Sequence, residues 1–88
     1  MITVYTINNC PYCNKIKELL IAEEISFEEI NCDLPENEEK FIELVKKTKS
    51  NSVPTIVVDK FILVPEVAFN TIDEGVGLIK RILAKLDG

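Results

Sequence analysis

Hydrophobic positions between residues 2 and 32 change their spacing twice. Residues 2–7 form an apolar, β-branched run that predicts a buried strand. From residue 11 to about residue 24 the apolar positions follow a helical period instead. The apolar face of that helix consists of Ile16, Leu19 and Leu20. Residues 25–32 predict a second strand. Its apolar positions are Phe27, Ile30 and Cys32.

The next stretch predicts a second helix. Asp33, followed by Pro35 and Glu36, resembles a capping-box start for a helix that runs to about Lys49. Acidic residues come first in this helix and lysines last, which complements the helix dipole. The apolar face consists of Phe41, Leu44, Val45 and Thr48.

A β-hairpin should follow this helix. Residues 54–58 and 61–64 are short β-branched runs, and only Asp59 and Lys60 separate them. Lys60 is unfavourable in such a turn because the tight turns of hairpins favour positive φ.

The C-terminal part, from about residue 66 to residue 86, is helical in its spacing. Its apolar positions are Ile72, Val76, Ile79, Leu83 and Leu86. Gly75 and Gly77 interrupt the pattern, and a glycine inside a helix costs about 1 kcal/mol relative to alanine. We therefore expect two short helices here. The whole pattern predicts an α/β fold of order β-α-β-α-β-β-α, in which helices flank a four-stranded mixed sheet.

Composition limits the classes of function. The 88 residues are 47% hydrophobic, which is enough for one core, so we expect a single domain over residues 1–88. The net charge of −5, with no strip of basic and aromatic residues, argues against a nucleic-acid partner. The absence of histidine excludes Cys-His proteolysis and His-ligated zinc.

Cysteine number and hydropathy bear on the compartment. The three cysteines cannot all pair within one chain, which favours a reducing cytoplasm. No apolar run approaches about 18 residues, and the N-terminus does not resemble a signal peptide. We therefore expect a cytoplasmic protein with no membrane partner.

Cys10-Pro11-Tyr12-Cys13 lies at the junction between the first strand and the first helix. The positive end of the helix dipole and the free N–H groups there favour a thiolate over a thiol. Cysteine in such a position titrates below its unperturbed value of about 8.5. Helical phase places Cys13 on the buried face and Cys10 before the first turn. We expect Cys10 to be an exposed attacking thiol and Cys13 a buried resolving thiol.

A zinc-binding pair is the alternative for Cys10 and Cys13, and Cys32 is the remaining cysteine. A zinc site needs about four ligands, and Cys10, Cys13 and Cys32 supply too few, so we expect no metal site. Free cysteine behaves as a small hydrophobic residue, so we expect Cys32 to lie in the core on the face of Ile30.

The predicted order, the Cys10-Pro11-Tyr12-Cys13 motif, and Val53-Pro54 at the start of the third strand resemble a dithiol glutaredoxin of the thioredoxin superfamily. The resemblance covers residues 1 to about 64. It implies a thiol-disulfide oxidoreductase with Cys10 and Cys13 as catalytic residues. It also implies no permanently bound cofactor, with glutathione as an electron-donating co-substrate.

The same resemblance implies the substrate contacts. A cis Val53-Pro54 bond would lie beside the thiols, and the extended backbone of Val53 would pair with substrate. Tyr12 would offer an exposed ring to the substrate. Pro11 completes the predicted substrate- and glutathione-binding residues and stiffens the first helical turn.

Three features depart from the family pattern. Ile7 stands where dithiol glutaredoxins commonly have a basic residue that meets a glutathione carboxylate. Val64-Pro65 replaces the usual Gly-Gly, and residues 66–68 replace the Cys/Ser-Asp-Asp segment that holds the γ-glutamyl group. These departures leave open a redoxin that a thioredoxin-reductase-like flavoprotein recharges.

A different class of function is a binding module in which paired chains bridge a [2Fe-2S] cluster. Pro11 and Tyr12 argue against it, because cluster binders of this family more often have other residues between or beside the cysteines. The expected partners are therefore glutathione, a flavoprotein reductase, and proteins with disulfides, with a ribonucleotide reductase among the candidates. We expect a monomer.

Overall fold

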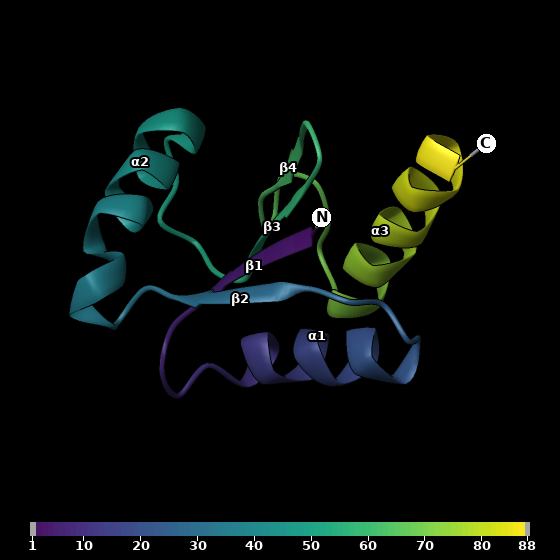
Figure 1. Ribbon diagram of the computed structural model, residues 1–88, viewed down its shortest axis with the longest axis horizontal. Helices are drawn as coiled ribbons and strands as arrows, with labels where there is room; N and C mark the ends of the chain where they lie inside the picture. The colour runs from purple at the N-terminus through teal and green to yellow at the C-terminus, as the bar shows by residue number, and fades with distance from the viewer. Residues whose placement is uncertain (1, 88) are drawn as a thin grey trace.

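Four strands form one mixed sheet in the order β2-β1-β3-β4, in a computed structural model that describes residues 2–87 (Figure 1). The strands are β1 (Ile2–Thr6), β2 (Glu28–Asn31), β3 (Thr55–Val58) and β4 (Phe61–Leu63). The helical elements are α1 (Pro11–Ala22), the 3₁₀ turn η1 (Pro35–Asn37), α2 (Glu38–Thr48) and α3 (Ile72–Asp87). The predicted β-α-β-α-β-β-α order is confirmed.

Strand β1 occupies a central position in the sheet and pairs differently on its two sides. It runs parallel to β2, with Val4 opposite Glu29, and α1 makes the crossover between them. It runs antiparallel to β3, with Val4 opposite Ile56, and β3 continues into the hairpin with β4. Because β1 leads into α1 through residues 7–10, the start of α1 lies at the carboxyl end of β1.

The main core lies between one face of the sheet and the helices α1 and α3, which contact each other. Alternate residues of β1 are buried, so one side of that strand faces this core. Burial of these side chains supplies the main driving force for folding. The buried cluster consists of Ile2, Val4, Ile16, Leu20, Ile56, Val58, Leu63, Phe69, Ile72, Val76 and Ile79.

Helix α2 lies apart from α1 and α3 (Figure 1). The side chain of Tyr5 lies on the side of β1 opposite that of Val4. Burial raises the pKa of Tyr5 most, followed by the charges of Cys32 and of Glu43 in α2. Glu43 of α2 is therefore one of the charges that act on Tyr5.

The prediction of two short C-terminal helices is wrong, because α3 is one helix from Ile72 to Asp87. Residues 66–71, which we expected to be helical, form a turn closed by a bridge between Pro65 and Phe69. Gly75 fits inside α3 for a steric reason, since a Cβ there would lie 3.2 Å from the ring of Phe69. Packing of the buried face of α3 outweighs the intrinsic cost of its two glycines.

The predicted capping box at residues 33–36 is also wrong. Pro35 begins the 3₁₀ turn η1, and α2 follows with Asn37 as an N-cap that makes no side-chain hydrogen bond. The Asp33 carboxylate instead accepts a hydrogen bond of 2.7 Å from the backbone N–H of Asn8. Asp33 therefore joins two loops rather than starting a helix.

The second strand is shorter than expected, since β2 covers only Glu28–Asn31. The backbone N–H of Ile25 bonds to the carbonyl of Leu20, so the chain closes α1 before β2 begins. Cys32 follows β2 and is half-buried, outside the main core cluster. Our expectation of a core cysteine is therefore wrong.

The hairpin is confirmed, and Asp59 rather than Lys60 adopts positive φ in its turn, at 54°. This conformation suits aspartate better than lysine. None of the helices within residues 2–87 is long and apolar enough to cross a membrane.

Candidate active site

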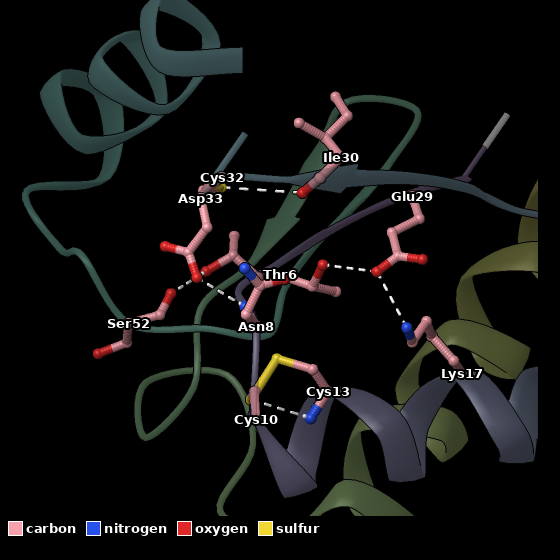
Figure 2. The surroundings of a disulfide bond; sticks show 11 residues. Thr6, Asn8, Cys10, Cys13, Lys17, Glu29, Ile30, Cys32, Asp33 and Ser52 are labelled. Atoms are coloured by element: carbon pink, nitrogen blue, oxygen red, sulfur yellow. Dashed lines mark hydrogen bonds and ion pairs between the residues drawn. A yellow bond between two sulfur atoms is a disulfide. The ribbon is translucent and has the colours of Figure 1, made fainter. Parts of the chain in front are cut away.

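Cys10 and Cys13 form a disulfide at the N-terminus of α1, with their Cα atoms 5.2 Å apart. Cys10 is the N-cap residue and Pro11 occupies the first helical position. The Sγ atom of Cys10 accepts a hydrogen bond of 3.1 Å from the backbone N–H of Cys13 (Figure 2). A sulfur atom thus takes the place that a Ser or Asp oxygen commonly occupies in an N-cap.

The two sulfurs differ in access, although less than we expected. Cys13 is 1% exposed and Cys10 is 8% exposed. The expectation of a well-exposed Cys10 is wrong for this disulfide form. Its side chain folds back over the first turn of α1 to meet the N–H of Cys13, and this brings it against the helix.

The charge environment at the start of α1 favours an anionic sulfur. The first turn contains no acidic side chain that would neutralise the positive end of the helix dipole. After reduction, the thiolate of Cys10 can accept the same N–H hydrogen bond that its sulfur accepts here.

Polar contacts with the end of β2 and the residues that follow it hold the loop that leads to Cys10. Asn8 donates its backbone N–H to Asp33, and its side-chain oxygen accepts from the amide of Asn31 at 2.8 Å. The Asn31 side-chain oxygen accepts the N–H of Asp33 at 2.9 Å. Asn9 follows with φ of 54°, a left-handed conformation that asparagine tolerates. This network fixes where the chain enters α1.

A second loop approaches from the other side of β1. The peptide bond between Val53 and Pro54 is cis, as the resemblance to glutaredoxins implies, and Val53 lies before β3 and outside the sheet ladder. The hydroxyl of Thr55 donates to the carbonyl of Ser52 at 2.7 Å. Pro54 and Thr55 are buried, so the end of this loop is anchored in the protein interior.

A groove of about 320 Å³ runs beside the disulfide turn. It brings together three of the predicted substrate residues, Tyr12, Val53 and Pro54, whereas Pro11 does not line it. The ring of Tyr12 is 66% exposed and is therefore accessible from solvent. The other lining residues are Ser52, Pro65, Glu66, Phe69, Asn70, Thr71 and Ile72.

The charge that lines this groove is negative. Glu66 is the one charged residue that lines it within the described part of the chain. Ile7, where a family member commonly has a cation, is 38% exposed and supplies no charge.

The N-terminus of α3 also borders the groove, and side chains of the same segment accept hydrogen bonds from its backbone N–H groups. One carboxylate oxygen of Glu74 accepts the N–H groups of Asn70 at 3.3 Å and Thr71 at 3.1 Å. The N–H of Glu74 donates to the Thr71 hydroxyl at 3.2 Å, which completes a reciprocal capping box. Sequence reasoning missed this feature, although the spacing Thr71-x-x-Glu74 signals it.

Another polar chain lies beside the disulfide (Figure 2). The buried hydroxyl of Thr6 donates to a carboxylate oxygen of Glu29 at 2.7 Å, and Lys17 of α1 contacts the same oxygen at 3.0 Å. The hydrogen bond from Thr6, followed by Lys17, lowers the pKa of Glu29, while partial burial opposes this shift. These contacts link β1, β2 and α1 next to Cys13.

Cys32 takes no part in this site. Figure 2 shows its sulfur directed at the carbonyl of Ile30, at 3.8 Å, and away from the disulfide. Burial, and then the negative charge of Asp33, raise the pKa of its thiol. Within residues 2–87 no group of three or more Cys, Asp or Glu side chains has an arrangement that would hold a metal ion.

Comparisons with known proteins agree with this geometry. The sequence profile of the glutaredoxin family matches residues 2–62. The glutaredoxin-like protein NrdH of Lactococcus lactis is 39% identical over 61 residues, which cover 69% of this chain and 81% of that protein. Glutaredoxin 3 of Escherichia coli strain K12 is 36% identical over 58 residues, which cover 66% of this chain and 68% of that protein.

Solved structures show the same fold. A thioredoxin-like protein of known crystal structure superposes with a TM-score of 0.69 at 29% identity, over 89% of this chain and 99% of that one. A buckwheat glutaredoxin in complex with glutathione superposes with a TM-score of 0.72 at 17% identity, over 96% of this chain and 76% of that one. The chain belongs to the glutaredoxin family of thiol-disulfide oxidoreductases and has the thioredoxin-like fold.

Proposed function

We propose that this chain reduces disulfides of protein substrates with Cys10 and Cys13, and that a flavoprotein of the thioredoxin reductase type recharges it in preference to glutathione. The thiolate of Cys10 attacks one sulfur of the substrate disulfide, forms a mixed disulfide and releases the other sulfur as a thiolate. The thiol of Cys13 loses its proton and attacks the Cys10 sulfur, which releases the second substrate thiolate. The reductase then returns two electrons to the Cys10–Cys13 disulfide, and one proton from solvent restores the Cys13 thiol beside the Cys10 thiolate.

The roles of the two cysteines follow from their positions on α1. Cys10, at the N-cap, is the more exposed residue of the pair and is next to the helix N–H groups, which would stabilise its thiolate. Cys13 is almost fully buried, so its natural partner is the sulfur of Cys10 rather than an external disulfide.

The groove beside the disulfide is where a substrate segment would lie. Val53, which lies outside the sheet ladder and next to Pro54, would offer its backbone to a substrate strand. The exposed ring of Tyr12 offers a flat apolar contact on the disulfide side of the groove. Pro11 fixes the first turn of α1, which presents Tyr12.

The acidic character of the groove is the observation that favours a protein reductase over glutathione. Glutathione has two carboxylates, and a charge-assisted hydrogen bond to each is worth about 1.5–3 kcal/mol when it forms. Within residues 2–87 no lysine or arginine lines the groove, and Glu66 would repel a carboxylate. Two N–H groups near the start of α3, which would otherwise attract an anion, already bond to Glu74.

Two coupled assays with insulin as the disulfide substrate test this proposal. In one, a bacterial thioredoxin reductase recharges the protein, and in the other, glutathione with glutathione reductase does so. We expect faster NADPH consumption in the first assay. Faster consumption with glutathione would overturn the preference. Failure of the pre-reduced protein to reduce insulin stoichiometrically would overturn the disulfide reductase activity itself.

Cys32 also bears on the compartment. It is a half-buried free thiol in a chain whose other two cysteines pair with each other. A free thiol of this kind is expected in a reducing compartment such as the cytoplasm, where we propose that the chain acts as a monomer.

A further inference from the structure

The far wall of the groove is a fixed turn between β4 and α3. The N–H of Glu66 donates to the carbonyl of Phe69 at 2.7 Å, and the N–H of Ala68 donates to the carbonyl of Val64 at 2.9 Å. Phe69 is 5% exposed, and its ring packs against Gly75 of α3. The backbone of Glu66 is therefore held in place at the edge of the groove.

Glu66 adopts a backbone conformation that glycine would adopt more easily. Its φ is 69°, in the left-handed region that disfavours side chains with a Cβ. The side chain is exposed and lines the groove. A glutamate at this position presents a negative charge to whatever binds beside the disulfide.

Tyr12 gives the same groove a second group that attracts cations. Its exposed aromatic ring has a negative face that attracts lysine and arginine side chains. Ser52, Asn70 and Thr71 add neutral polar groups to the lining. A carboxylate and an open aromatic ring in one groove form a suitable environment for a cationic side chain.

We propose that Glu66 is a specificity-determining residue that selects substrate segments with a lysine or arginine side chain close to the reactive disulfide. This inference rests on the proposed reduction of protein disulfides, because it concerns the substrate class of that same site. The net charge of the chain, −5, would also attract a basic partner at long range.

A pair of disulfide-bonded peptides, identical except for Lys or Glu next to one cysteine, provides the test. We measure kcat/KM for their reduction by the wild-type protein, with dithiothreitol as the recharging reagent. We expect a preference of about fivefold or more for the Lys peptide, since an exposed ion pair contributes up to about a factor of five and the Glu peptide is repelled as well. The preference should fall as salt is added.

Three variants identify Glu66 as the source of the preference. Glu66→Gln should remove most of it, and Glu66→Lys should reverse it in favour of the Glu peptide. Glu24→Gln is the matched control, because Glu24 is also an exposed glutamate with positive φ, at 58°, but lies after the end of α1. It should keep the wild-type preference.

Equal kcat/KM for the two peptides in the wild-type protein would overturn the role of Glu66 and leave disulfide reduction intact. A preference that Glu66→Gln does not change, or that Glu24→Gln removes equally, would overturn it as well. Failure to reduce either peptide would instead contradict the proposed function.

Discussion

The sulfur of Cys10 accepts a hydrogen bond of 3.1 Å from the backbone N–H of Cys13, three residues along the chain. Through this contact Cys10 caps the N-terminus of α1, and it is also one half of the disulfide. After reduction, the same N–H and the helix dipole act on the sulfur of Cys10 and favour its thiolate. The fold thus places the sulfur of Cys10 where the start of α1 favours its thiolate.

We predict that iodoacetamide labels Cys10 well ahead of Cys32 in the reduced protein at about pH 6. The helix terminus favours the thiolate of Cys10, whereas burial and then Asp33 raise the pKa of the Cys32 thiol. Mass spectrometry of the alkylated peptides gives the two rates, and labelling of Cys32 should accelerate as the pH rises. Cys32→Ser serves as the control, in which the Cys10 rate should not change. Comparable labelling of the two cysteines at about pH 6 would refute the prediction.

The sequence alone predicts the strands, α1 and the hairpin, because local periodicity records which side chains face the core. The same local pattern fails for α3, where Gly75 and Gly77 suggest a break. The reason for Gly75 is tertiary, since Phe69 comes from outside the helix and packs where a Cβ would be. Asp33 is likewise a residue type that often starts a helix. Its carboxylate instead accepts a hydrogen bond from the backbone N–H of Asn8, which is 25 residues away in sequence.

The candidate site shows the same division. Cys10 and Cys13 can be singled out from the sequence by their position before the first helix, and Val53-Pro54 by its resemblance to the family motif. Glu66 is not legible as a groove residue, because its position depends on how the turn after β4 folds against α3. The near-burial of Cys10 was also missed, since it depends on the direction of its side chain at the N-cap.

Glu29 should stabilise the protein in a pH-dependent way. Thr6 and Lys17 lower its pKa in the folded protein, so its contribution is present above its ordinary pKa of 4.5 and is lost as the pH falls through the lowered value. We predict that Glu29→Gln lowers the free energy of unfolding at pH 7. The difference between variant and wild type should shrink at about pH 3.

Urea denaturation of both proteins at the two pH values measures this difference. Glu23→Gln is a suitable control, because Glu23 contacts Lys80 on a more exposed surface, where an ion pair contributes little. A difference for Glu29→Gln that stays constant with pH would contradict the assigned contacts.

The two glycines of α3 should respond oppositely to alanine. A Cβ at Gly77 meets nothing within 4 Å, so Gly77→Ala should stabilise the protein by up to about 1 kcal/mol through helix propensity. A Cβ at Gly75 would lie 3.2 Å from the buried Phe69 ring, so Gly75→Ala should destabilise it by about 1 kcal/mol. Urea denaturation of the oxidised proteins gives both values. Equal stabilisation by the two substitutions would show that the Phe69 ring yields easily.

A cation at position 7 should improve the use of glutathione. Ile7 is 38% exposed where the family commonly has a basic residue, so Ile7→Lys should lower the apparent KM for glutathione by several-fold, at about 1.4 kcal/mol for each factor of ten. Ile21→Lys makes the same change of charge near the other end of α1 and should leave this KM unchanged. An Ile7→Lys protein with the wild-type KM would show that the missing cation does not limit glutathione binding.

The most direct test of the mechanism is to identify the sulfur that first bonds to a substrate. Reduced Cys13→Ser and Cys10→Ser proteins are each mixed with an oxidised protein disulfide, the reaction is quenched with acid, and the products are mapped by mass spectrometry. We predict a mixed disulfide at Cys10 that accumulates in Cys13→Ser, because the resolving thiol is absent, and none at Cys13 in Cys10→Ser. A mixed disulfide that forms on Cys13 or Cys32 as readily as on Cys10 would contradict the account.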